Sequence, residues 1–215
     1  MSHETILMVG DSYRNPNLFY KTRFLDSTPF IYLYHQGLSK IITPASSWEQ
    51  AKIEANVEEV YPFTNFGYVK KLKTYGHKDL AFVVMLKEIL DFFDIKDLTV
   101  GKDFPVFYAN GLTKLGIALH IDCDLFVKER SIKTEQEIVW IQETQSALEK
   151  GMFAAMTMLK ESNYMKDGTL IYQNEKLTSK RLKKAIEVTL LEENCNIFDT
   201  IVACGPNSAD PHYSG

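Results

Sequence analysis

Cysteine is scarce in this chain. The sequence has three, Cys123, Cys195 and Cys204, and no CxxC pair. An odd, widely spaced set does not form a disulfide framework and lacks the spacing of a zinc site. We expect reduced thiols, with those in apolar stretches buried as small hydrophobic side chains. Such cysteine usage is typical of a reducing, cytoplasmic setting.

Long hydrophobic runs and an excess of positive charge are also missing. The apolar stretches are much shorter than the roughly 20 residues that a membrane-spanning helix needs. The N-terminus carries Glu4 and has no basic region before an apolar run. The formal net charge is −4, and basic runs at 70–73 and 180–184 have acidic residues nearby, as on a solvated helix face. We therefore expect neither a membrane nor a nucleic-acid partner.

Local catalytic motifs are absent as well. The sequence contains no HExxH and no phosphate-binding glycine loop, and Ser208 lacks a GxSxG setting. His3, His35 and His77 stand alone. Covalent catalysis by serine or cysteine therefore has no local support in the sequence.

What is present is an ordinary globular composition, with 45% hydrophobic and 24% charged residues in 215. The first part of the chain alternates predicted strands and helices. Expected strands lie at 5–9, 30–34, 38–42, 57–61, 98–101 and 116–121. Expected helices run to 55 from a cap at Ser46 or Ser47, and over 66–73, 80–93 and 104–115. This alternation predicts an α/β domain over residues 1–127.

A boundary is expected at residues 130–134, after which a second region covers 128–215. Thr134 and Glu137 have the spacing of a capping box, in which each side chain bonds the backbone N–H of the other. Apolar residues of the helix that follows recur on one face, at Ile138, Ile141, Leu148, Met152, Ala155 and Leu159. Thr178 or Ser179 is expected to cap another helix, and residues 200–204 to form a final strand.

Four segments together carry a family resemblance. Residues 11–24 (DSYRNPNLFYKTRF) resemble the segment that opens creatinase-type N-terminal domains, with Arg23 where that family usually has glycine. Residues 130–138 (RSIKTEQEI) are similar to the start of a pita-bread catalytic domain, and Leu177-Thr178-Ser179 to its second capped helix. Residues 199–215 (DTIVACGPNSADPHYSG) resemble the "IVASG-N-A-PHY" segment of that domain. The family is that of the pita-bread metallopeptidases: Xaa-Pro aminopeptidase P, prolidase and creatinase.

The resemblance implies a fold and a function. The fold is a creatinase-type mixed α/β domain followed by an incomplete α/β pita-bread domain. The full-length parent would be a Xaa-Pro peptidase-like hydrolase that removes residues preceding proline from short peptides, and a homodimer. Its two divalent metals (Mn, Co or Zn) would be held by two Asp, one His and two Glu downstream of the PHY segment, so no metal ligand is expected in this chain.

His212 is the candidate substrate-binding residue. The resemblance implies that its imidazole contacts substrate, and a loop histidine can donate to a carbonyl oxygen or stabilise developing charge. Asn207 and Tyr213 either line the same pocket or only shape the loop. Two other hypotheses about the function remain: a non-catalytic pseudo-peptidase that binds peptides or proteins, and a metal-free creatinase-like amidinohydrolase.

A second cluster of polar residues has a weaker pattern. His120, Asp122 and Asp124 alternate, so a strand would point all three to one face. His-x-Asp-x-Asp is compatible with a hard-metal site, and equally with a strand end in solvent. The simpler interpretation is the solvated strand end, because a good metal site needs further ligands and a second shell.

The resemblance also leads to an expectation about the apolar stripe at 138–159. In the family this stripe covers the pita-bread sheet, of which only part is encoded here. We expect exposed apolar side chains along the stripe, to be covered by another segment, a partner chain or a longer parent.

Overall fold

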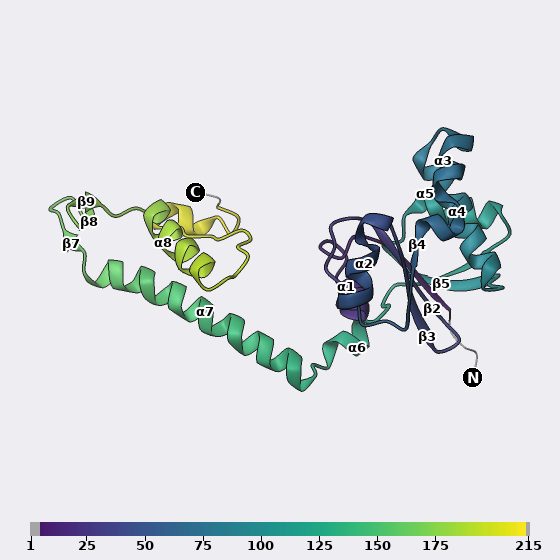
Figure 1. The fold of residues 1–215 in the computed structure, drawn as a ribbon. Helices are drawn as coiled ribbons and strands as arrows, with labels where there is room; N and C mark the ends of the chain where they lie inside the picture. Colours follow the sequence, from purple (N-terminus) through teal and green to yellow (C-terminus); the bar gives the residue numbers. More distant parts are fainter. Residues whose placement is uncertain (1–4, 214–215) are drawn as a thin grey trace. The chain divides into compact units, whose positions relative to one another are not determined.

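The computed structural model describes residues 5–213. The chain divides into two compact units, Met1–Ile132 (unit 1) and Lys133–Gly215 (unit 2). Each unit is described by itself (Figure 1). The division lies within the boundary expected at 130–134, whereas the domain limits 1–127 and 128–215 stay a prediction.

Unit 1 is built on a six-stranded mixed sheet with the order β4-β3-β2-β1-β5-β6. Three of its five pairings, β3 with β4, β1 with β5 and β5 with β6, are parallel. Only β2 runs against the others, pairing with β1 from Ile6↔Tyr34 to Gly10↔Phe30. The strands are β1 (Ile6–Gly10), β2 (Phe30–His35), β3 (Leu38–Thr43), β4 (Glu59–Pro62), β5 (Asp97–Gly101) and β6 (Ala118–Asp122).

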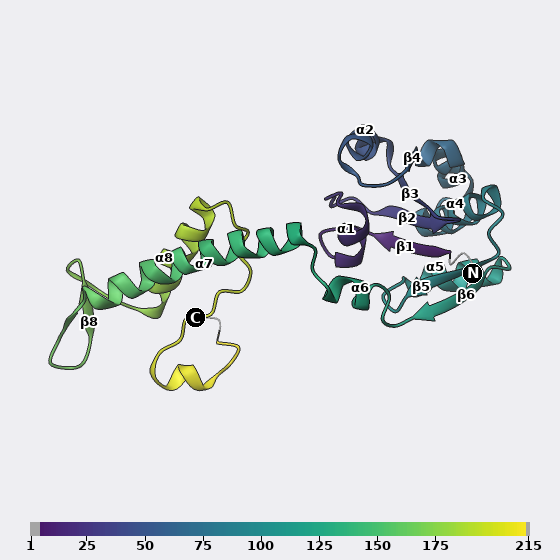
Figure 2. The ribbon, with the colours of Figure 1, turned by 90° about the horizontal axis from the view of Figure 1, so that it is seen from below.

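Helices cover both faces of this sheet because its strands are apolar on both sides (Figures 1 and 2). Alternate residues of β1 enter two separate cores: Leu7 and Val9 one, Ile6 and Met8 the other. α1 (Pro16–Thr22) and α2 (Ala45–Glu54) contribute to the second core. α4 (Lys78–Phe92) and α5 (Val106–Lys114) contribute to the first. The remaining helices of the unit are α3 (Tyr68–Tyr75), α6 (Val127–Ser131) and a 3-10 turn at Phe63–Phe66.

Most local signals in the first region are confirmed. Asn15 caps α1, its side chain accepting from the N–H groups of Asn17 and Leu18. The β2–β3 hairpin turns at Gln36 and Gly37, both with positive φ, as a two-residue hairpin requires. The predicted serine cap of α2 is wrong. Pro44 occupies the N-cap with no side-chain hydrogen bond, and the N–H of Ser47 donates to the carbonyl oxygen of Pro44.

Arg23 stands at the end of α1 in the left-handed conformation. Its φ is 53° and its N–H donates to the carbonyl oxygen of Phe19 at 2.7 Å. This conformation favours glycine at a helix C-terminus because a Cβ is crowded there. An arginine therefore adopts a backbone conformation that favours glycine, at the position where the resembling segments usually have glycine.

Unit 2 consists of two helices, a small sheet and an irregular C-terminal segment. The long helix α7 (Glu135–Lys160) begins at the predicted capping box of Thr134 and Glu137, and α8 (Ser179–Glu192) begins at the predicted cap Thr178. Between them lies a three-stranded antiparallel sheet with the order β7-β8-β9. Its strands are β7 (Asn163–Tyr164), β8 (Leu170–Tyr172) and β9 (Glu175–Lys176).

α7 and α8 lie side by side (Figures 1 and 2), and small residues make their contact. The buried residues of α7 are Ala147, Gly151 and Ala155, spaced four apart on one face. A Cβ on Gly151 would lie 3.4 Å from Cγ2 of Ile186. The close approach of the helices therefore depends on these small residues. The spacing of the large apolar residues in the sequence did not predict this contact.

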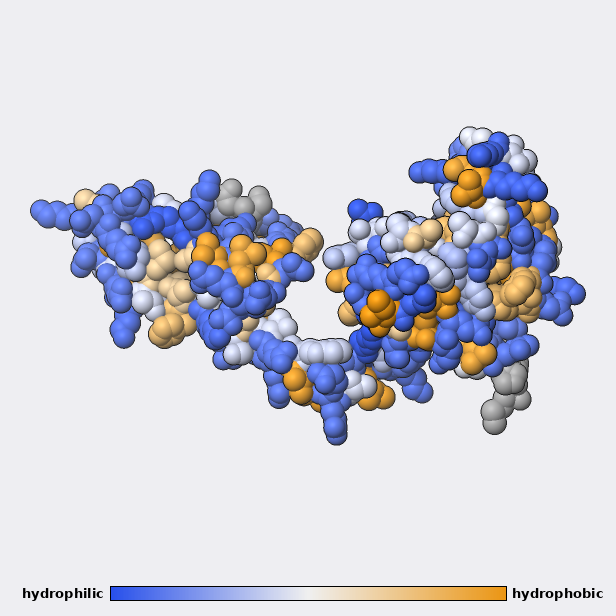
Figure 3. Space-filling view, viewed as in Figure 1, coloured by the Kyte–Doolittle hydropathy of each residue, from blue (hydrophilic) through white to orange (hydrophobic). Residues whose placement is uncertain are grey.

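The large apolar residues of α7 lie mostly on the surface, as expected for the 138–159 stripe. Of the six predicted stripe residues only Ala155 is buried. The other five, between 44% and 54% exposed, are Ile138, Ile141, Leu148, Met152 and Leu159. Figure 3 shows apolar side chains at the surface of this unit. The expectation of an exposed stripe is confirmed; what covers it stays a prediction.

Two expectations are wrong: that residues 200–204 form a strand, and that the cysteines in apolar stretches are buried. Residues 200–204 form no strand, and a 3-10 turn follows at Gly205–Ala209. A strand needs a hydrogen-bonding neighbour, and within the described residues none pairs with this segment. The segment's Cys204 is accordingly exposed, as is Cys123, while Cys195 is half-buried. Within residues 5–213, no helix combines the length and the apolar character that crossing a lipid bilayer requires.

Candidate functional site

His212 lies in a turn of the C-terminal segment of unit 2. Its N–H donates to the Oδ1 atom of Asp210 at 2.9 Å, and the N–H of Tyr213 donates to the carbonyl oxygen of Asp210. The imidazole is exposed and makes no hydrogen bond or ion pair within residues 5–213. Asp210 therefore fixes the backbone at His212 while the ring stays available to a ligand.

The neighbouring candidates take different positions. Asn207 is exposed in the 3-10 turn, and its carbonyl oxygen accepts from the N–H of Asp210. Tyr213 is half-buried. The backbone of both residues makes hydrogen bonds within the loop that carries His212, and the choice between the two roles weighed for their side chains stays a prediction.

The His120, Asp122 and Asp124 pattern does not form the predicted shared face. β6 ends at Asp122, and Asp124 lies in the following turn, where its N–H donates to Oδ1 of Asp122 at 2.9 Å. His120 instead pairs across the sheet, with Nε2 2.7 Å from Oδ2 of Asp97 on β5. The strand is too short for the alternation to reach Asp124.

A divalent metal, which the family resemblance implies for a parent enzyme, does not fit the described residues. Over residues 5–213, no three side chains of His, Cys, Asp or Glu are grouped so as to hold a metal ion. Hard and borderline metals need several such ligands converging on one point. We therefore assign this chain no metal-dependent step.

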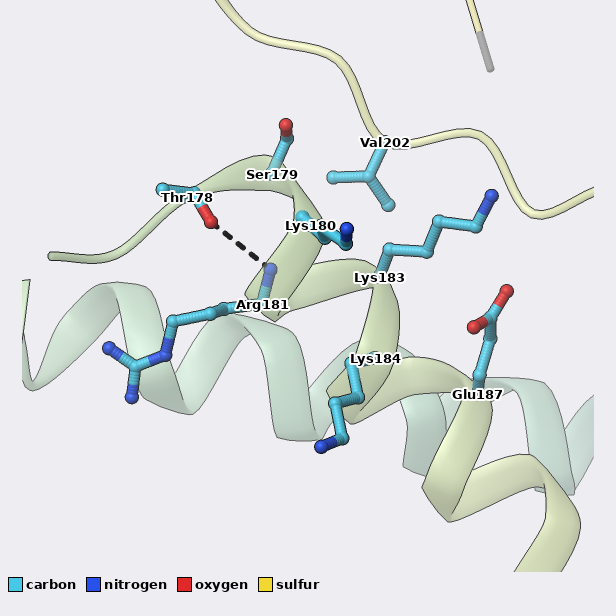
Figure 4. Close-up of a pocket in the computed structure, with 8 residues that line it drawn as sticks. All are labelled: Thr178, Ser179, Lys180, Arg181, Lys183, Lys184, Glu187 and Val202. Atoms are coloured by element: carbon cyan, nitrogen blue, oxygen red, sulfur yellow. Dashed lines mark hydrogen bonds between the residues drawn. The ribbon is translucent and has the colours of Figure 1, made fainter. Parts of the chain in front are cut away.

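A basic pocket of about 600 Å³ lies at the start of α8 (Figure 4). The N–H of Arg181 donates to Oγ1 of Thr178 at 3.3 Å, and Val202 approaches from the C-terminal segment. Arg181 and Lys184 also line the pocket, and their charged ends point away from Val202 (Figure 4). Arg181 is engaged by the carbonyl oxygens of Tyr172 and Lys176. This arrangement agrees with the solvated helix face expected at 180–184.

A second pocket, of about 370 Å³, lies in unit 1, and four aromatic side chains are among the residues that line it. We call it the aromatic pocket and define it by Phe63, Lys78, Asp79, Tyr68, Phe82 and Tyr108. Its rings pack edge to face or tilted, with centroids 5.6 Å apart for Phe63 and Tyr68 and 4.9 Å apart for Phe82 and Tyr108. Sequence reasoning missed this site because residues from separate elements supply its rings, and the aromatic content alone indicated only core bulk.

Tyr108 is a titratable residue that lines the aromatic pocket. Burial raises the pKa of Tyr108 to about 12, and the nearby carboxylate of Asp79 adds to the effect. The phenol donates to Oδ1 of Asp79 at 3.4 Å, a long hydrogen bond. Because this folded-state pKa is raised, the neutral phenol stabilises the fold fully below the unfolded value near 10, and that stability is lost as the pH rises toward 12.

We predict that Asp79→Asn lowers the pKa of Tyr108 toward 10, because the amide removes the negative charge that disfavours the phenolate. The pKa is read from the Cζ chemical shift in tyrosine-labelled protein, with Tyr108→Phe to assign the signal. Asp91→Asn, which removes a carboxylate paired with Lys87 elsewhere on α4, is the matched control. An unchanged Tyr108 titration in the Asp79 variant would contradict the assigned cause.

The fold has counterparts among solved structures. A prolidase from Pyrococcus furiosus matches with a TM-score of 0.69 and 17% identity, over 98% of this chain and 56% of that chain. A Xaa-Pro dipeptidase from Bacillus anthracis matches with a TM-score of 0.71 and 19% identity, over 98% and 51%. An X-Pro aminopeptidase from Thermotoga maritima matches with a TM-score of 0.62 and 17% identity, over 90% and 47%. Neither a protein-family model nor a curated protein sequence matches the chain.

These matches define the class of fold. The chain spans about half the length of the structures it matches. Its mixed α/β architecture is that of the N-terminal portions of pita-bread proteins, so the predicted resemblance is confirmed at the level of the fold. The named structural neighbours are a prolidase, a Xaa-Pro dipeptidase and an X-Pro aminopeptidase.

Proposed function

We propose that this chain is the N-terminal portion of a Xaa-Pro peptidase-like metallohydrolase, which removes residues preceding proline from short peptides. The observation that carries the proposal is the match of almost the whole chain to about half of a prolidase and of a Xaa-Pro dipeptidase. The four family-like segments support it independently, because they occur in the family's order along the sequence.

The two regions take different roles in this proposal. Residues 1–127 form the creatinase-like N-terminal domain, which walls the active site, restricts substrates to short peptides and contributes to a homodimer. Residues 128–215 form the beginning of the catalytic domain and deliver His212 to the substrate. The protein is proposed to work in the cytoplasm, in keeping with three cysteines that form no disulfide.

His212 is the one residue of this chain to which we assign a substrate contact. Its exposed imidazole, held by the turn at Asp210, is suited to donate a hydrogen bond to a peptide carbonyl oxygen. Two divalent metals (Mn, Co or Zn) in the parent would supply an activated hydroxide. The family resemblance places their ligands downstream of the PHY segment, so the role proposed for this chain is binding and orientation.

Two alternatives share the fold. A non-catalytic pseudo-peptidase would use the same surfaces to bind peptides or protein partners, and a creatinase-like amidinohydrolase would place small-molecule contacts around His212. The discriminating observation is the sequence encoded after the codon for Gly215. Two Asp, one His and two Glu in family order favour the peptidase, whereas a continuation without them favours an alternative.

We predict that the 215-residue chain alone does not hydrolyse Xaa-Pro peptides. In a parent with the five ligands, His212→Ala is expected to lower kcat by roughly 10²- to 10³-fold, the typical effect of removing one donor to developing charge. Steady-state kinetics with a Xaa-Pro dipeptide measure this change. Tyr213→Phe, at the adjacent residue, is the control. Full activity of the His212 variant would contradict the assigned contact, and hydrolysis by the 215-residue chain would contradict the division of roles.

A further inference from the structure

The aromatic pocket occupies a favourable place in the fold of unit 1. β1, β3 and β4 run in the same direction, so their carboxyl ends meet at one edge of the sheet. Val9 on β1, Pro44 just after β3 and Phe63 just after β4 all line the pocket. Crevices outside the carboxyl ends of strands are the usual ligand sites of open α/β sheets.

The walls of the pocket are apolar and shaped by rings. Phe63 and Phe82 are buried, whereas Tyr68 and Tyr108 are half-buried. Phe82 contacts the rings of Phe63, Tyr68 and Tyr108. A volume of about 370 Å³ lies within the range of small-molecule sites and has room for a single compact ligand.

The lining of the pocket also includes two residues of opposite charge. Lys78 and Asp79 both line the pocket from the first turn of α4. Successive residues of a helix point about 100° apart, so the long, flexible Lys78 side chain must turn toward Asp79 for one small ligand to meet both charges. The Asp79 side chain is 35% exposed, and its contacts are the long hydrogen bond from Tyr108 and His77 Nδ1 at 3.9 Å. The Lys78 ammonium has no hydrogen bond or ion pair within residues 5–213.

This charge pattern selects among ligand classes. A purely apolar ligand would use neither charge, a simple cation would face Lys78, and a simple anion would face Asp79. A molecule that carries an ammonium, a carboxylate and an apolar side chain complements all three features of the pocket. Its ammonium also gains from the electron-rich faces of the tyrosine rings.

We propose that the aromatic pocket binds a free amino acid with a large apolar side chain. The ammonium group of the ligand pairs with Asp79, its carboxylate pairs with Lys78, and its side chain packs against Phe63, Tyr68, Phe82 and Tyr108. This site lies wholly in unit 1 and stands independently of the proposed peptidase function.

Isothermal titration calorimetry of the 215-residue protein tests the proposal with three probes of similar size. L-Phenylalanine carries both charges, phenethylamine only the ammonium and 3-phenylpropanoate only the carboxylate. We expect saturable binding of L-phenylalanine, with each analogue about tenfold weaker or more because one charge-assisted contact is lost. Equal binding of all three compounds would contradict the assigned charge pairs and leave only an apolar groove. No detectable binding of L-phenylalanine at 10 mM, about the weak limit of such titrations, would overturn the proposal.

Variants assign the binding to the pocket. Asp79→Asn and Lys78→Gln are each expected to weaken L-phenylalanine binding about tenfold or more. The matched controls Asp91→Asn and Lys87→Gln neutralise an exposed ion pair on the same helix and should leave binding unchanged. Thermal unfolding checks that each variant folds. If Asp79→Asn does not fold, the exposed Lys78→Gln decides alone, and unaltered affinity in that variant contradicts the proposal.

Discussion

Replacing Ile141, Leu148 and Met152 together by glutamine is expected to convert a self-associating chain into a monomer. These side chains are 53%, 44% and 54% exposed on neighbouring turns of α7. Contiguous exposed apolar surface drives association, whereas glutamine keeps the helix propensity and removes that drive. Light scattering coupled to size-exclusion chromatography measures the change, and fluorescence of a hydrophobic dye should fall with it.

The control for this experiment is Ile53→Gln on α2, where the isoleucine is 83% exposed and lies outside the α7 stripe. We expect this variant to associate like the unmodified chain, because a scattered surface hydrophobe is not a patch. A monomeric unmodified chain without dye binding would show that the exposed stripe does not drive association. Dye binding that persists in the triple variant would show that the surface responsible for association lies outside these three residues.

Gly111→Ala is expected to destabilise unit 1, although alanine is the better helix former. A Cβ on Gly111 of α5 would lie 2.6 Å from Cγ1 and 2.9 Å from Cγ2 of Val83 on α4. Val83 is buried and β-branched, so it has little freedom to move away. Overpacking typically costs about 1–3 kcal/mol, and the gain in helix propensity offsets up to about 1 kcal/mol. We expect a net loss of about 1–2 kcal/mol and a fall in Tm of roughly 3–8 °C.

A compensating variant isolates the cause. Val83→Ala with Gly111→Ala frees the space that the new methyl group needs, so the double variant should be more stable than the sum of the single effects predicts. Gly151→Ala is the matched control on α7, because its nearest contact of 3.4 Å accommodates a methyl group. Strictly additive effects of the two substitutions in unit 1 would contradict the steric explanation.

The sequence predicted the elements of unit 1 well because strong local signals coincide there. Continuous apolar runs mark strands that are buried on both faces. In unit 2, Thr134 and Thr178 cap helices as predicted. The serine cap of α2 failed because Pro44 sets the helix start through its own fixed backbone angle. Local patterns therefore located the elements, and proline decided one boundary.

Features that depend on neighbours were less predictable. Residues 200–204 have the composition of a strand, but pairing decides whether a strand forms, and within the described residues nothing pairs with them. The contact of α7 with α8 depends on the small residues Ala147 and Gly151, which periodicity of large side chains does not reveal. The position of His212 was predicted as a loop, whereas the aromatic pocket assembles residues from separate elements and has no local signature.

The strand order of unit 1 has a consequence for synthesis of the chain. β1, made first, lies in the interior of the sheet between β2 and β5. One of its edges pairs with β2 in the segment that ends with β4 at Pro62, but the other edge must wait for β5, which ends at Gly101. The 39 intervening residues correspond to roughly 2–8 s of translation. During that interval the nascent chain exposes an apolar half-sheet with an open edge, so the first third of the protein has the greatest need of a chaperone on the ribosome.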